Sequence, residues 1–165
     1  MSPVLSTLVE CEAWSGHEGF EALASEVIAK AVAATRIKLR PEAEVSLLLC
    51  DDARIRDINR EWRGLDKPTN VLSFPAAPPA MLGESPAVGD IAIAYETVAR
   101  EAEEEAKSFR DHYMHMVLHG FLHLIGYDHE TDEEADEMEA LETSILGGLG
   151  VADPYAMTEQ DLTQI

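Results

Sequence analysis

The stretch from His119 to His129 reads HGFLHLIGYDH, and we expect the rest of the chain to be organised around it. His119 and His123 are four residues apart in an apolar segment typical of a helix, so their side chains share one face, with Cβ atoms about 5–6 Å apart. Gly126 follows, and glycine readily adopts the left-handed conformation that ends a helix and turns the chain back. That turn would bring His129 to the same ion. The spacing therefore predicts one metal ion held by three imidazoles.

Three imidazoles around an open fourth position are typical of a catalytic zinc site, whereas structural zinc sites have four protein ligands and are rich in cysteine. Zinc lowers the pKa of water to about 7 in such a position, which makes hydroxide available for hydrolysis. Histidines that merely pack are the simpler alternative, but three of the chain's six at this spacing favour one Zn²⁺ per chain. His115 would close the site as a fourth ligand, so we expect it to line a cleft or to pack. His112 and His17 have no partner at ligand spacing.

Residue 120 sets this chain apart from zinc peptidases. The metzincin pattern H-E-x-x-H-x-x-G-x-x-H matches at every other defined position, but residue 120 is Gly instead of Glu. In the peptidases that glutamate is the general base that acts on the water, and glycine cannot accept a proton. A zinc peptidase with a base from elsewhere in the fold stays as an alternative.

A second segment, residues 59–75, reads NREWRGLDKPTNVLSFP. Together with the histidine stretch it resembles the YbeY family, bacterial rRNA maturation factors that act as metal-dependent single-strand endoribonucleases. The segment is similar to the family's arginine-bearing stretch and its T-[DN]-V-L-S-F strand. Gly89-Asp90-Ile91 resembles the G-D-I that opens the next strand, and residues 138–150 fit the last helix. The likeness covers roughly residues 44–155.

The resemblance implies a zinc-dependent endoribonuclease in rRNA maturation and ribosome quality control, with His119, His123 and His129 as metal ligands. It also implies that Arg63 is catalytic, and a guanidinium at the end of a helix suits a phosphate, which it can bind through two donors. A plain surface arginine is the alternative, and Arg60 is the competing candidate one helical turn earlier.

The partners that the resemblance implies are single-stranded RNA from an rRNA precursor and components of the ribosome or its small subunit, with no DNA. The nucleophile stays open between water and the RNA 2′-OH. A ribosome-associated factor whose metal is structural is a further alternative, although three histidines are one ligand short of a usual structural site.

For several polar residues near these motifs, the sequence allows two roles. Asp128 precedes His129 and either accepts a hydrogen bond from a ligand imidazole or ties down the turn. Local turn bonding explains Thr69, Asn70 and Ser73 as well as contact with a substrate does.

The charge distribution limits where RNA could bind. The formal net charge is −20, which repels phosphate, because affinity for nucleic acid comes largely from lysine and arginine. Eight of the 12 basic residues lie in residues 36–67, beside seven acids, so a phosphate-facing surface must come from there. Residues 111–165 contain thirteen acids and no Lys or Arg. The acidic run 130–142 predicts a solvated helix face, because apolar residues interleave with it at helical spacing.

At 165 residues we expect one metallohydrolase domain over residues 1–165, large enough to bury a core. We expect no signal peptide and no membrane span, since no apolar run approaches about 18 residues. Cys11 and Cys50 lie in or beside strand-like segments and are expected to be reduced. These features favour a cytoplasmic protein.

Hydrophobic periodicity and turn residues predict an α+β fold. The expected architecture is a small sheet packed with about five helices, and the family resemblance implies that the sheet is four-stranded and mixed. We expect strands at residues 4–11, 45–50, 71–74 and 88–95, helices at 18–34, 52–62, 96–106, 109–125 and 132–147, and an irregular proline-rich loop at 75–86.

Overall fold

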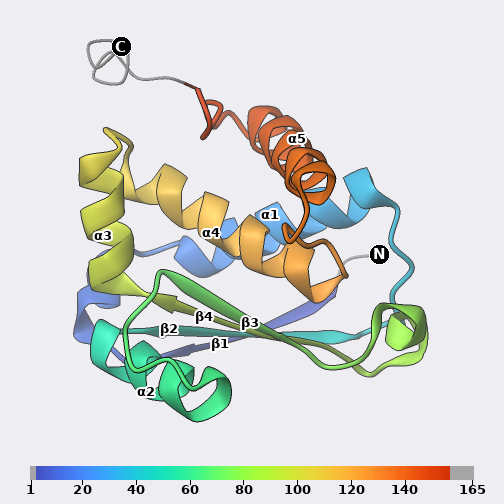
Figure 1. Cartoon of the computed structure of the whole chain (residues 1–165), viewed down its shortest axis with the longest axis horizontal. Coiled ribbons are helices and arrows are strands. Elements are labelled where there is room, and N and C mark those ends of the chain that lie inside the picture. Colours follow the sequence, from blue (N-terminus) through green and yellow to red (C-terminus); the bar gives the residue numbers. More distant parts are fainter. Residues whose placement is uncertain (1–2, 157–165) are drawn as a thin grey trace.

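The computed structural model describes residues 3–156 and contains a four-stranded mixed sheet in the order β1-β2-β4-β3 (Figure 1). Strands β1 (Val4–Val9), β2 (Glu44–Cys50) and β4 (Ala87–Ala94) are parallel, and β3 (Val71–Pro75) runs antiparallel to β4 at one edge. The expected α+β class with a small mixed sheet is confirmed. The expected domain 1–165 includes residues 1–2 and 157–165, which lie outside the described residues.

Within residues 3–156, five α-helices pack around the sheet, as expected. Figure 1 shows α2 on one face of the sheet and α4 on the other, with α5 beyond α4 and α3 beside it. The helices are α1 (Phe20–Thr35), α2 (Asp52–Arg63), α3 (Tyr95–Glu104), α4 (Phe109–Leu124) and α5 (Asp132–Gly148).

Two short 3₁₀ helices, Glu12–Gly16 and Pro79–Glu84, were not predicted. The second lies inside the proline-rich loop that we expected to be irregular, so that expectation was wrong for its central part. Pro79 stands at the first position of this turn, where a helix needs no backbone donor and the proline ring already sets φ.

Helix boundaries follow the capping residues. The Asp51 side chain accepts a hydrogen bond from the backbone N–H of Arg54 at 2.8 Å and starts α2. Gly64, with φ of 71°, ends the helix in the left-handed conformation. Ser108 and Thr131 cap α4 and α5 in the same way as Asp51 caps α2.

Helix α4 is the centre of the core. Most of its residues are buried, because the sheet covers one side while α1 and α5 cover the other. His119 and His123, near its C-terminal end, keep part of their surface exposed. A largely buried helix therefore carries two of the predicted ligands. Within the described residues, no helix combines the length and the apolar character needed to cross a membrane.

Both cysteines are free thiols, as expected. Cys50 is buried at the end of β2, and burial together with the nearby charge of Asp51 raises the pKa of its thiol to about 12. This thiol therefore stays protonated and unreactive at neutral pH.

Candidate metal centre

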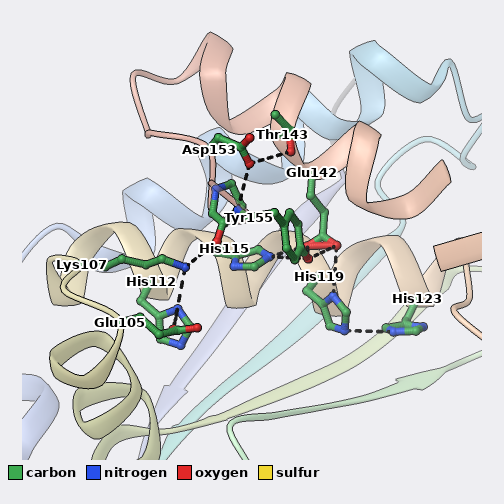
Figure 2. Close-up of polar contacts among 11 residues, drawn as sticks. Glu105, Lys107, His112, His115, His119, His123, Glu142, Thr143, Asp153 and Tyr155 are labelled. Carbon is green, nitrogen blue, oxygen red and sulfur yellow. Dashed lines mark hydrogen bonds and ion pairs between the residues drawn. The ribbon is translucent and has the colours of Figure 1, made fainter. Parts of the chain in front are cut away.

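The structure brings the three predicted histidine ligands together. The Nε2 atoms of His119 and His123 are 3.2 Å apart, and Figure 2 shows the two rings next to each other along α4. Ligand atoms of these two residues and of His129 all lie within 4.8 Å of one another. Two nitrogens bound to one tetrahedral zinc at the usual bond length lie roughly 3.3 Å apart. The donor set and its spacing therefore fit a zinc ion.

The turn after α4 positions His129. Gly126 has φ of 107°, its backbone N–H donates to the carbonyl of His123, and the next N–H, of Tyr127, donates to the carbonyl of Leu122. Such a backbone is strained for residues with a side chain. Gly126 therefore turns the chain back toward the helix, as its place in the sequence predicted.

Asp128 stabilises this turn. Its carboxylate accepts a hydrogen bond from the backbone N–H of His129 at 2.8 Å, while the Nδ1 atom of that histidine lies 3.8 Å away, beyond hydrogen-bond distance. Of the two readings left open by the sequence, the structure shows the contact with the turn.

The protonation state of His123 suits a metal ligand. Its burial, followed by the nearby charges of His119 and His129, lowers the pKa of this imidazole below the usual 6.5. His123 is therefore neutral at pH 7, with a lone pair available for a metal ion.

Glu142 of α5 lies directly behind these ligands, and sequence analysis missed it. The side chain is 1% exposed, and one carboxylate oxygen lies 3.4 Å from Nδ1 of His119. The carboxylate also contacts Nε2 of His115 and accepts a hydrogen bond from the hydroxyl of Tyr155 at 3.0 Å (Figure 2). Burial alone would raise the pKa of Glu142, but hydrogen bonds from His115 and His119 outweigh it and lower the pKa to about 2.

The prediction that residues 130–142 form a solvated helix face was therefore wrong for Glu142. The buried residues of α5 are Met138, Glu142, Ile145 and Leu146, which repeat at helical spacing. The sequence signal for Glu142 is an acidic residue at a helical position whose neighbours on the same face are apolar.

His115 is buried and packs against Glu142 and Tyr155. This agrees with the packing role expected for it. His115, His119 and Glu142 also form a second group whose ligand atoms are close enough for one metal ion, and this group shares His119 with the first.

The three histidines open into a cleft of about 600 Å³ that is also lined by Arg63. Arg63 is exposed at the end of α2, and its side chain makes no ion pair or hydrogen bond to any residue in the range 3–156. The competing candidate Arg60 pairs with Asp57 at 2.9 Å and with Asp66 at 3.5 Å.

Two of the three polar residues near β3 also line this cleft. Asn70 and Ser73 are part of the lining, whereas Thr69, which is half-buried, lies outside it. The Asn70 amide donates to Glu101 at 2.9 Å, and its carbonyl oxygen accepts from the backbone N–H of Val71. A local hydrogen bond within the turn and a tertiary hydrogen bond to α3 therefore hold Asn70 in place.

Comparison with known proteins identifies the family. A family model described as Endoribonuclease YbeY matches residues 10–150. The chain belongs to the YbeY family. A relative from Methylocella silvestris, named Endoribonuclease YbeY, is 54% identical over 155 residues, which cover 94% of this chain and 87% of the relative. A relative of the same name from Nitrobacter winogradskyi is 53% identical over 163 residues, covering 96% and 85% of the two chains. The resemblance seen in the sequence is thus confirmed and extends further toward the N-terminus.

The fold is also similar to a solved structure. The solution structure of TM1509 from Thermotoga maritima superposes with a TM-score of 0.55 and covers 94% of this chain and 98% of its own, at 23% sequence identity. At this identity the similarity supports the arrangement of the sheet and helices alone.

Proposed function

We propose that this protein is a zinc-dependent, single-strand-specific endoribonuclease that acts on rRNA precursors in ribosome maturation and quality control. The observation that carries the proposal is the shared cleft, in which three imidazoles and Arg63 line one cavity. A metal site beside a free guanidinium suits a phosphodiester, since both stabilise negative charge on phosphate oxygens. The relatives named as endoribonucleases support the choice of RNA.

In this proposal His119, His123 and His129 would hold the zinc ion. Bound there, zinc supplies a Lewis acid that polarises a phosphoryl oxygen and lowers the pKa of water. An imidazole must be neutral to act as a ligand, and the lowered pKa of His123 favours the neutral form of this residue.

Arg63 would bind two oxygens of the scissile phosphate and stabilise the charge that develops there. Its fork-shaped donors suit such bidentate contact, and no carboxylate of the described chain competes for them. By contrast, Arg56 and Arg60 are already paired with Asp66. Arg54, the fourth arginine of α2, pairs with Glu10 at 3.5 Å, so Arg63 is the one of the four whose guanidinium is available to substrate.

The net charge of −20 would repel RNA phosphates, but the position of Arg63 allows a phosphate to bind locally. Phosphate contact needs only a local cation, and the exposed ion pairs on α2 are weak enough to exchange for phosphate oxygens. We therefore place the RNA backbone along the C-terminal end of α2, inside the basic region of residues 36–67.

We further propose that residues 1–165 work as one metallohydrolase domain in the cytoplasm, with the ribosome or components of its small subunit as partners. Neither a membrane nor DNA is among the partners that we propose.

The test uses purified protein of measured metal content. Single-stranded RNA, double-stranded RNA and an unfolded protein such as casein are incubated with it, beside a sample stripped of metal by a chelator. We expect cleavage of single-stranded RNA alone, loss of this activity on stripping, and recovery with zinc. Intact RNA at full zinc occupancy would refute the proposal, and metal-dependent proteolysis would favour the peptidase alternative. The ends of the products identify the nucleophile, because attack by the 2′-OH leaves a 2′,3′-cyclic phosphate.

A further inference from the structure

We infer that Glu142 is a positioning residue of the metal centre, which acts through His119. Its carboxylate accepts a hydrogen bond from Nδ1–H of His119 and so selects the tautomer whose Nε2 lone pair faces the metal position. The inference rests on the proposed role of His119 as a ligand. Glu142 itself touches neither metal nor RNA in this arrangement.

The geometry of His119 carries this inference. Its Nδ1 atom lies 3.4 Å from a carboxylate oxygen of Glu142, on the α5 side of the ring. Its Nε2 atom lies 3.2 Å from Nε2 of His123, on the side of the predicted metal site (Figure 2). A neutral imidazole carries a single N–H, so a carboxylate at Nδ1 draws the proton there and leaves Nε2 as the acceptor. Carboxylates bonded to ligand histidines in this way fix ring orientation and raise ligand basicity.

The surroundings of Glu142 suit an orienting role. A buried carboxylate is stable only when it is paired and hydrogen-bonded, and this one has partners on both oxygens. One oxygen faces His119 and accepts from the Tyr155 hydroxyl, and the other contacts His115 and lies 3.2 Å from the same hydroxyl. His115 and Tyr155 thus hold the carboxylate of Glu142 in place, and one of its oxygens faces Nδ1 of His119.

A second metal ion bound by His115, His119 and Glu142 is a less consistent reading of the same atoms. In that case His119 would bind metal through both ring nitrogens, which requires an imidazolate with no proton. His115 and Tyr155 would also have to give up their contacts with the carboxylate. The hydrogen-bonded arrangement needs neither change.

The test compares Glu142→Ala and Glu142→Gln with wild-type protein by two measurements made without RNA. The first is zinc affinity, by competition with a chelator of known affinity. The second is the tautomer of His119 in the zinc-free protein, read from ¹⁵N chemical shifts of its ring. The matched control is Glu137→Ala, an exposed position on the same helix.

Glu142→Ala should weaken zinc binding by about 10-fold, the lower end of the usual 10–100-fold range, because 3.4 Å is long for such a bond. The Nδ1–H tautomer should become less populated. Glu142→Gln keeps the shape and an acceptor but loses the charge, so it should fall between wild type and alanine. The control should match wild type.

The buried position of Glu142 requires a check on folding. Tyr155→Phe removes one hydrogen bond to the carboxylate and leaves Glu142 in place, and we expect a few-fold loss of zinc affinity. Lower thermal stability of the Glu142 variants with unchanged zinc affinity and tautomer would show a purely structural role and overturn the inference. Two zinc ions per chain would overturn it as well. Because neither measurement involves RNA, a failure of RNA cleavage alone would count only against the proposed nuclease activity.

Discussion

Gly120 lies against Ile91 so closely that a Cβ atom at residue 120 would come 3.0 Å from Cγ2 of that isoleucine. The same Cβ would lie 3.3 Å from Cγ2 of Val71. A glycine inside a helix costs about 1 kcal/mol relative to alanine, and here it lets α4 approach β3 and β4. The departure from the peptidase pattern therefore has a packing reason, because residue 120 is buried against the sheet and has no room for a glutamate.

The first prediction concerns this contact. Gly120→Ala should fail to stabilise the protein, and we expect a loss of about 1 kcal/mol or more in the free energy of unfolding, because the added methyl overpacks the interface. Gly147→Ala is the control, since a Cβ there meets nothing within 4 Å and should add helix propensity. Urea unfolding measures both. Equal stabilisation by the two substitutions would mean that the sheet shifts to accommodate the added methyl group, and that the packing explanation is wrong.

The second prediction concerns the metal ligands. Alanine at His119, His123 or His129 should each lower zinc occupancy, because two remaining imidazoles bind the ion more weakly than three. Elemental analysis of purified protein gives the zinc content, and His17→Ala serves as a control outside the cluster. Full zinc in all three ligand variants would place the metal elsewhere.

The third prediction separates Arg63 from its neighbours. Loss of a preorganised charge stabiliser costs about 10²–10³ in turnover, so Arg63→Ala should be nearly inactive toward RNA while it keeps its zinc and its fold. Arg63→Lys should recover part of the rate, because it keeps the charge but loses the bidentate geometry. Arg60→Ala, which removes a residue paired with Asp57 and Asp66, should keep most activity. A wild-type rate in zinc-loaded Arg63→Ala would move the phosphate contact to another cation.

The fourth prediction uses Trp62, the residue before Arg63, which is 68% exposed. Exposed aromatic rings stack on bases of single-stranded RNA, and each stacked base contributes about 1–3 kcal/mol. Trp62→Ala should therefore weaken binding of a short single-stranded RNA to zinc-free protein by about 5-fold or more, and Trp62→Phe should retain most of the affinity.

Tryptophan fluorescence gives this measurement an internal control. Trp14 is 3% exposed in the core, so quenching by RNA reports on Trp62. Equal affinity of Trp62→Ala and wild type, with no quenching in wild type, would show that RNA does not pass over this end of α2.

The fifth prediction concerns acid stability. Glu101 accepts hydrogen bonds from His112 and Asn70, both at 2.9 Å. Burial raises the pKa of Glu101, but these bonds outweigh it, so the pKa lies below the usual 4.5. Because the folded-state pKa is the lower one, ionised Glu101 stabilises the fold above about pH 4.5, and this contribution is lost as the pH falls through the folded-state pKa.

Glu101→Gln should therefore lower the free energy of unfolding by about 1 kcal/mol or less at pH 7, because solvent screens the partly exposed carboxylate. The difference in stability from wild type should shrink in acid. Urea unfolding at several pH values gives the curve, with exposed Glu103→Gln as the control. A difference that stays constant down to pH 3 would show that the charge of Glu101 does not contribute.

Much of the fold could be predicted from local signals. The strands and the five helices lie within a few residues of the ranges expected from hydrophobic periodicity and turn chemistry. The 3₁₀ helix Pro79–Glu84 was missed, since a proline-rich segment has no periodic pattern. The edge position of β3 also depends on which strands meet, and a short apolar run does not specify its neighbours.

The sequence by itself determined the proximity of His119, His123 and His129, because helical spacing and the left-handed turn at Gly126 act over eleven residues. Only the tertiary structure decided that Glu142, 23 residues later in the chain, lies next to Nδ1 of His119. It also decided that Arg63 lines the same cleft as the three histidines. These contacts join separate elements, and they depend on how α4 and α5 pack on each other and on the sheet. That packing comes from the summed shapes of many buried side chains, which no local pattern contains.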